Sequence, residues 1–238
     1  MMKALILASG AGTRLSPLTD SLPKTLLDVG GNTILGRQLS ALTRYGITDV
    51  IITTGPFRET IEEHVRRNHQ LDVTFVHNPV YESTNYIYSL WLARDLIDSD
   101  ILLLHADLLF DDMLVGRLIE ANDNRVLVNR NVEPPEKDFK ALIENGVVTR
   151  IGVDITGADA FFCAPMYRFS LDSFRIWLAE IDNFVRDKRV DCYAEEALNR
   201  VSDRIDLHPL YYEEFCMEID TLEDLELARD LVKNNLTG

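Results

Sequence analysis

The chain has 238 residues, of which 46% are hydrophobic, and it carries a net charge of −15. This length and hydrophobic content suffice for one large core, so we expect a single domain. The sequence shows neither a membrane-spanning apolar stretch nor a signal peptide, which predicts a cytoplasmic protein with no membrane partner. Nucleic acid usually binds a basic surface, so the acidic charge also argues against a nucleic-acid partner.

The first half of the chain alternates apolar runs, which predict strands, with amphipathic segments, which predict helices. Strands are expected at residues 3–8, 49–54, 72–77 and 100–105, and helices at 33–45, 57–68 and 85–97. This order predicts an α/β fold with a Rossmann-like, mostly parallel sheet flanked by helices. Such sheets bind ligands at the carboxyl ends of their strands.

The second half of the chain has a different pattern. Beyond residue 125, shorter strands and turns predict a small antiparallel lid over the site. Helical spacing returns at residues 170–186, 190–200 and 221–235, and we expect the last helix to pack on the main sheet.

The first predicted strand runs into a loop that contains two glycines and two cations. Residues 7–24 read LASGAGTRLSPLTDSLPK. Gly10 and Gly12 allow the backbone to approach a ligand closely, and main-chain amides in such a turn can bind phosphates. Arg14 can bind phosphate oxygens bidentately, and Lys24 adds a compact positive charge. The loop therefore predicts a triphosphate site.

Two common glycine-rich motifs do not match this loop. A P-loop ends in Gly-Lys-Ser/Thr, which is absent, and a dinucleotide fingerprint has a third glycine where this chain has Leu15. Pro17 and Pro23 are expected to keep the loop extended instead of starting a helix at once. With Thr13-Arg14-Leu15 and Pro23-Lys24 included, the string resembles the signature of nucleotidyltransferases. These enzymes couple a nucleoside triphosphate to a phosphorylated small molecule, and they include sugar-1-phosphate nucleotidylyltransferases.

An acidic residue follows the strand predicted at residues 100–105. Asp107, in His105-Ala106-Asp107, would project into the same crevice as the glycine loop, where a magnesium ligand is needed. The alternative is an aspartate that caps a helix opening near Asp111. In the resembling family this position carries the metal-binding aspartate of a D-x-D or D-A-D motif, so here His105 replaces the first acid.

A second candidate metal ligand lies near the C-terminus. Alternation places Glu218 and Asp220 on one face of a short strand, just before a helix that starts at Thr221. A helix start is also the commonest place for an acidic residue, which gives a purely structural alternative. The family carries an I-D-T-x-E-D-L string here whose aspartate binds the metal. The resemblance therefore implies Mg²⁺ on Asp107 and Asp220.

Two further segments resemble a narrower group. The helix start with Asn85 and Tyr88-Ser89-Leu90 is similar to that of phosphocholine cytidylyltransferases and their bacterial relatives, which activate aminoethylphosphonate and other small phosphorylated compounds. Sugar-1-phosphate enzymes usually have a G-x-A-x-A run in this region, which is absent. Residues 190–193 resemble that group's V-D-L-Y segment, although Ala194 stands where a tryptophan commonly follows. Without this tryptophan, the acceptor pocket is expected to present fewer aromatic faces to a quaternary ammonium group. A compound with a primary amine is therefore as good a candidate acceptor as phosphocholine.

The resemblance implies specific roles for individual residues. Arg14 and Lys24 are expected to be catalytic. The nucleotide-binding residues are expected to be Leu7, Ala8, Ser9, Gly10, Ala11, Gly12, Thr13, Arg14, Lys24 and Ala106. The acceptor-binding residues are expected to be Asn85, Tyr86, Lys140, Asp191 and Tyr193. Packing is an equal alternative for Tyr86 and Tyr193, and a solvated surface position is the alternative for Lys140.

We therefore divide the single domain of residues 1–238 into a nucleotide-binding core (1–124), an acceptor-binding or lid part (125–215) and a C-terminal part with a metal ligand and a helix (216–238). The expected reaction transfers CMP from CTP to the phosphate or phosphonate of a small non-sugar acceptor and releases pyrophosphate. Its products would feed cell-surface polysaccharide modification or small-molecule biosynthesis. Two alternatives stay open: a sugar-1-phosphate nucleotidylyltransferase, and a nucleotide-binding regulatory subunit without catalysis. A homodimer is compatible with the sequence.

Overall fold

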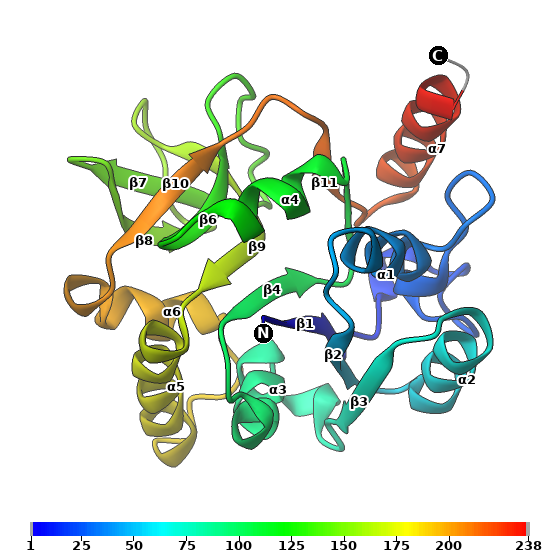
Figure 1. Cartoon of the computed structure of the whole chain (residues 1–238), viewed down its shortest axis with the longest axis horizontal. Coiled ribbons are helices and arrows are strands. Elements are labelled where there is room, and N and C mark those ends of the chain that lie inside the picture. The colour runs from blue at the N-terminus through cyan, green and yellow to red at the C-terminus, as the bar shows by residue number, and fades with distance from the viewer. Residues whose placement is uncertain (1, 237–238) are drawn as a thin grey trace.

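The computed structural model describes residues 2–236, and their side chains as far as residue 233, so the outer limits 1 and 238 of the predicted domain lie outside it. The protein is built on a central sheet with the strand order β10-β6-β9-β4-β1-β2-β3 (Figure 1). These strands are β1 (Lys3–Ala8), β2 (Asp49–Thr54), β3 (Asp72–His77), β4 (Ile101–His105), β6 (Asn124–Asn129), β9 (Phe161–Phe169) and β10 (Leu207–Tyr211).

Most of this sheet is parallel. β1 pairs in parallel with both β2 and β4, β2 with β3, and β10 with β6. On this path, β9 alone runs against its neighbours β4 and β6. The α/β class, the parallel sheet and the four strands expected in the first half are confirmed.

Helices cover both faces of the sheet. One face packs against α1 (Ile34–Arg44), α2 (Arg58–Asn68) and α4 (Met113–Glu120), and the other against α3 (Tyr86–Ala93), α5 (Leu171–Arg186) and α6 (Ala194–Arg200). Successive strand residues point to opposite faces: in β1, Leu5 and Leu7 join the core with α3, whereas Ala4 and Ile6 join the core with α1. Burial on both faces explains why these strands read as continuous apolar runs.

The second half of the chain contains the small antiparallel part that the sequence predicts, while its other strands join the central sheet. β6, β9 and β10 extend the central sheet, because β6 and β9 are buried along nearly their whole length and need cover on both faces. The antiparallel part is a hairpin of β7 (Lys140–Glu144) and β8 (Val147–Gly152), which joins β9. A small separate antiparallel sheet pairs β5 (Leu108–Phe110) with β11 (Cys216–Glu218).

The last helix, α7 (Leu222–Leu236), does not pack on the main sheet as expected. Its Leu225, Ala228 and Val232 belong to a third, smaller core beside the first loop, together with Leu15 and Leu109. Figure 1 shows α7 at the edge of the molecule, beyond α1. Among the described residues, none of the helices has the length and apolar character needed to cross a membrane.

Single 3₁₀ turns interrupt several connections. They are η1 (Thr13–Leu15), η2 (Lys24–Leu26), η3 (Tyr81–Ser83), η4 (Arg94–Leu96) and η5 (Ser202–Arg204). Pro17 and Pro23 predicted an extended loop, but the first loop contains two of these turns and is extended only in part. Pro23 precedes η2 in an extended conformation, and the turn begins only at Lys24.

Candidate active site

The candidate site lies where β1 and β4 end side by side. Leu7 of β1 is in register with His105 of β4. The amide of Ala106 donates a hydrogen bond to the carbonyl of Leu7 over 3.2 Å. The loop after β1 and the turn that carries Asp107 therefore meet at one edge of the sheet, because parallel strands present their carboxyl ends together.

A chain of buried polar groups anchors the loop from behind. The hydroxyl of Ser9 donates to Oγ1 of Thr53 over 2.9 Å, and it accepts from the hydroxyl of Ser89 over 2.9 Å. Ser89 in turn accepts from the side-chain amide of Asn78 over 3.1 Å. All four residues are buried. The loop is thus tied to β2 and α3 through its side chains, which holds its backbone in one place.

The two glycines of the loop differ in what they require. Gly12 has φ = 67°, in the left-handed region, and a Cβ there would lie 3.1 Å from Cβ of Lys24. A Cβ on Gly10 would have no protein atom within 4 Å. Gly12 is therefore needed for the turn itself, whereas Gly10 leaves open space for a ligand.

Four charged groups meet beside the loop. The ammonium of Lys24 lies 2.6 Å from Oδ2 of Asp107 and 2.8 Å from Oδ1 of Asp220. Arg14 Nη1 lies 3.1 Å from the other oxygen of Asp220. Residues far apart in sequence thus form one alternating cluster, in which Lys24 sits between two carboxylates.

The cluster keeps its members charged. Burial alone would lower the pKa of Lys24, but the charges of Asp107 and Asp220 raise this pKa above its ordinary value. Burial would raise the pKa of Asp107, yet the charge of Lys24 keeps that pKa below its ordinary value. Burial lowers the pKa of His105, so its imidazole is neutral near pH 7.

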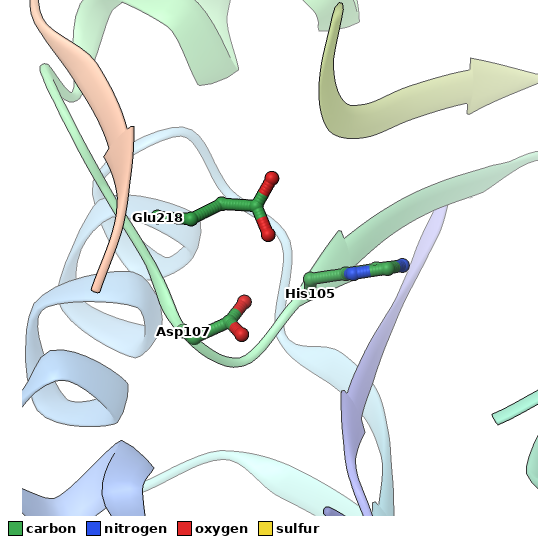
Figure 2. A group of neighbouring side chains, drawn as sticks. All are labelled: His105, Asp107 and Glu218. Carbon is green, nitrogen blue, oxygen red and sulfur yellow. The ribbon is translucent and has the colours of Figure 1, made fainter. Parts of the chain in front are cut away.

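The same place suits a divalent cation. Oδ1 of Asp107 and Oε1 of Glu218 are buried and have no hydrogen-bond partner among the described residues. Figure 2 shows both carboxylates turned toward one space, with the nearer nitrogen of His105 at its border. One ligand atom from each of these three residues lies within 4.8 Å of the others. Carboxylate oxygens of this kind are ligands that fit Mg²⁺. In this structure the cation between Asp107 and Asp220 is the ammonium of Lys24.

A first cavity of about 460 Å³ opens on the glycine loop. All of the predicted nucleotide-binding residues line it except Ala11, which lies within the loop but not on the cavity wall. Further lining residues, which the sequence analysis did not assign, are Pro23, Thr25, Asn78, Tyr81, Thr84 and Ser89. Of the polar ones, only Ser89 belongs to a motif read from the sequence, so the fold alone reveals Thr25, Asn78, Tyr81 and Thr84.

A second cavity of about 330 Å³ shares the charged cluster with the first. Gly10, Gly12, Arg14, Lys24 and Asp107 line both cavities. The second adds Lys137, Asp138, Phe139, Val153, Tyr193, Glu218 and Asp220. Two ligands bound in the two cavities would therefore meet at Lys24.

The segment just before β7 supplies two charges to the second cavity. Lys137 Nζ lies 2.7 Å from Oδ2 of Asp224 and 3.7 Å from Oδ2 of Asp220. Asp138 is only 7% exposed, and its burial raises its pKa to about 6. Neither residue was predicted to line the site, although the charged string Glu136-Lys137-Asp138 directly after Pro134-Pro135 was the available signal.

Aromatic rings form another wall of the second cavity. The rings of Tyr86 and His105 are 4.6 Å apart, and those of Phe139 and Tyr193 are 5.1 Å apart. The hydroxyl of Tyr86 donates to Glu195, which is almost fully buried and also accepts from Tyr167 over 2.8 Å. Glu195 therefore fixes the position of the Tyr86 ring and does not face the cavity itself.

The predicted acceptor-binding residues fall into two groups. Asn85, Tyr86 and Tyr193 line the second cavity. Lys140 and Asp191 are not among its lining residues. Lys140 is buried, and its ammonium donates to the main-chain carbonyls of Glu136 and Val153 over 2.6 and 3.0 Å, while Asp191 is exposed. The ammonium of Lys140 is thus hydrogen-bonded by main-chain carbonyls from both sides of the β7–β8 hairpin.

The chain belongs to the nucleotidyl transferase family, which it matches over residues 3–138. It is thus a nucleotidyltransferase, the class of enzyme that the resemblance of the first loop implied. Over 162 residues it is 31% identical to the CMP-5′-(3-aminopropyl)phosphonate synthase of Streptomyces rubellomurinus, with 67% of this chain covered but only 26% of that protein.

Two further comparisons extend over nearly the whole chain. The choline-phosphate cytidylyltransferase of Streptococcus pneumoniae is 28% identical over 242 residues, covering 98% of this chain and 99% of that protein. The solved structure of the CTP:phosphocholine cytidylyltransferase from Streptococcus pneumoniae superposes with a TM-score of 0.83 at 23% identity, covering 97% of this chain and 99% of that chain. Sugar-phosphate enzymes such as mannose-1-phosphate guanylyltransferase are also among the relatives.

Proposed function

We propose that the protein transfers CMP from CTP to the phosphate or phosphonate of a small non-sugar acceptor and releases pyrophosphate. The observation that carries this proposal is the cluster of Lys24, Asp107 and Asp220, which lies where the two cavities meet. A transferase of this kind must bring two anionic substrates together. Lys24 and Asp107 line both cavities, and Asp220 lines the second, so this cluster can contact both substrates.

We assign the following roles to the residues of the site. The glycine loop binds the triphosphate in the first cavity, and Arg14 holds the pyrophosphate portion. An oxygen of the acceptor attacks the α-phosphorus in line, and the bond to the pyrophosphate oxygen breaks. Lys24 lies between the reacting groups and stabilises the charge that builds up on the α-phosphate. The attacking oxygen is already ionised near pH 7, so no general base is required and positioning supplies most of the catalysis.

Asp107 and Asp220 are the residues that we propose to hold Mg²⁺. The unpartnered oxygen of Asp107 and the position of a cation between the two acids support this assignment. Bound Mg²⁺ would add charge neutralisation at the α-phosphate. Since Glu218 and His105 border the same space, either could adjust how tightly the ion is held.

The choice of CTP and of a non-sugar acceptor is supported by the relatives. Two of them are named for making a CMP-phosphonate and for activating choline phosphate, and the second spans the full chain. The second cavity is consistent with a small acceptor, because its volume is about 330 Å³ and three aromatic residues narrow it. We propose a cytoplasmic enzyme, in keeping with substrates that are both soluble anions.

A sugar-1-phosphate nucleotidylyltransferase is the second candidate. It is favoured by the relatives that act on mannose-1-phosphate and by a fold that is shared with a solved glucose-1-phosphate thymidylyltransferase at a TM-score of 0.82. The aromatic wall of Tyr86, Phe139 and Tyr193 argues against it, since a hexose needs several polar partners to replace its hydration.

Pyrophosphate release tests the proposal directly. Each nucleoside triphosphate is combined, with magnesium, with phosphocholine, phosphoethanolamine, aminoethylphosphonate, phosphorylated amino acids and hexose-1-phosphates. We expect release with CTP and a non-sugar acceptor, and loss of it in Lys24→Gln. Release only with a hexose phosphate and another triphosphate would establish the second candidate, and nucleotide binding without any release would point to a regulatory subunit.

A further inference from the structure

Asp138 is a buried acid with one side-chain oxygen that no described residue hydrogen-bonds. Its side chain lines the second cavity, the residue is 7% exposed, and Oδ1 has no hydrogen-bond partner among the described residues. A buried carboxylate oxygen without a donor is costly, by about 1–3 kcal/mol. A group of this kind at a cavity wall is therefore a place where a bound ligand can supply the missing donor.

The lysines next to Asp138 in the chain do not meet this need. The ammonium of Lys137 is bound by Asp224 at 2.7 Å, and that of Lys140 by the carbonyls of Glu136 and Val153. Both cations are thus engaged by other groups, although they lie one and two residues from Asp138.

The walls around Asp138 suit a small cation. Glu218 lines the same cavity and also has a buried oxygen without a partner. The rings of Phe139 and Tyr193, 5.1 Å apart, stand beside these acids, and aromatic faces attract cations. Arg14 and Lys24 line another part of this cavity. Positive and negative groups are therefore both available to one ligand.

From this arrangement we propose that the acceptor is zwitterionic and that its primary ammonium group donates a hydrogen bond to Asp138. The inference rests on the proposed function, because it takes the phosphoryl end of the same acceptor to lie at Lys24.

The unpartnered oxygen distinguishes a primary from a quaternary amine. A primary ammonium has three N–H donors, whereas a trimethylammonium group has none and would leave Oδ1 of Asp138 buried and unpaired. Sites built to hydrogen-bond a ligand discriminate strongly against analogues that lack the donor. The aromatic faces alone would accept both cations, so the acid sets the selectivity.

The test compares 2-aminoethylphosphonate with its N,N,N-trimethyl analogue, which share the same phosphonate. We would measure kcat/KM with CTP, and the dissociation constant of each acceptor in the presence of a CTP analogue that cannot release pyrophosphate. Both are repeated in Asp138→Asn and in the control Asp159→Asn, which makes the same charge change at an exposed position. Asp138→Ser serves as a second variant if thermal unfolding shows that Asp138→Asn does not fold.

We expect at least a tenfold preference for the primary amine, lost in Asp138→Asn and retained in Asp159→Asn. Equal use of both acceptors, or equal effects of the two substitutions, would overturn the inference while CMP transfer itself stands. The absence of pyrophosphate with CTP and either acceptor, together with activity on a hexose-1-phosphate, would overturn the proposed function as well.

Discussion

The ammonium of Lys24 lies 2.6 Å from Oδ2 of Asp107, although 83 positions separate the two residues in sequence. The same ammonium is 2.8 Å from Asp220, which is contributed by the C-terminal region. One cation thus joins the first loop, the end of β4 and the segment before α7. This geometry leads to predictions about charge, metal binding and stability that can be checked separately.

Replacing Lys24 by Gln should lower kcat by about a hundredfold to a thousandfold, because one preorganised group at the reacting phosphate is typically worth that much. The two aspartates would also lose their shared cation. Pyrophosphate release measures kcat, and Lys188→Gln, which removes an exposed lysine, is the matched control. Activity within tenfold of the unaltered protein would remove Lys24 from the mechanism.

Removing a carboxylate from the same cluster should change metal binding. We expect Asp107→Asn and Asp220→Asn each to weaken magnesium binding at least tenfold, since each deletes one charged oxygen ligand. Isothermal titration with Mg²⁺, or Mn²⁺ followed by electron paramagnetic resonance, measures this without turnover. Metal affinities that match those of Asp203→Asn, an exposed acid, would contradict the assignment.

Asp138 should make stability depend on pH in a specific direction. Burial raises its pKa from 3.8 to about 6, so the folded state binds a proton more tightly than the unfolded state. Its contribution is complete below about pH 3.8 and is lost as the pH rises through 6. The free energy of unfolding of Asp138→Asn should therefore rise by about 3 kcal/mol relative to that of the unaltered chain as the pH increases from 3.8 to 7.

Urea unfolding at several pH values measures this difference. The comparison is made between the two proteins at each pH, which cancels the other carboxylates. Asp159→Asn should show no such trend, since that residue is exposed. A constant offset between Asp138→Asn and the unaltered protein across the whole range would refute the prediction.

The two tyrosines on Glu195 should both matter for stability. Tyr86→Phe and Tyr167→Phe each remove a donor from a buried carboxylate, which is expected to cost about 1–3 kcal/mol. The free energy of unfolding in urea measures the loss. The control Tyr88→Phe, at a ring that stacks on Trp91, should change this free energy little. An equal loss in all three variants would show that the hydrogen bonds to Glu195 do not stabilise the fold.

Glycine substitutions should separate folding from binding. Gly12→Ala forces a side chain into a left-handed conformation and against Lys24, so we expect a loss of about 1–2 kcal/mol in stability. Gly10→Ala meets no protein atom, so its fold should be unchanged while CTP binds at least tenfold more weakly. Thermal unfolding and CTP titration of the two variants test this prediction. A loss of stability in Gly10→Ala but not in Gly12→Ala would mean that Gly10 is the residue required for the turn.

Much of the fold was readable from sequence for a physical reason. Strands buried on both faces must be apolar throughout, so β1, β2 and β4 stand out as uninterrupted runs and their bounds were predicted closely. The glycine loop was equally readable, because Gly12 and Lys24 lie within one short stretch. The second half was harder: β9 is as apolar as β1, and only its pairing shows that it runs antiparallel inside the main sheet.

The site divides in the same way. The sequence by itself determined the family, the order of the elements and the residues near the first loop, since these follow from local patterns along the chain. Only the tertiary structure decided that the ammonium of Lys140 is bound by two main-chain carbonyls, that Asp191 is exposed and outside the cavity lining, and that Asp138 lines the cavity. Whether a side chain is buried, and whether it finds a hydrogen-bond partner, depends on segments that are distant in sequence and meet in space. The spacing of residues along one segment does not contain this information.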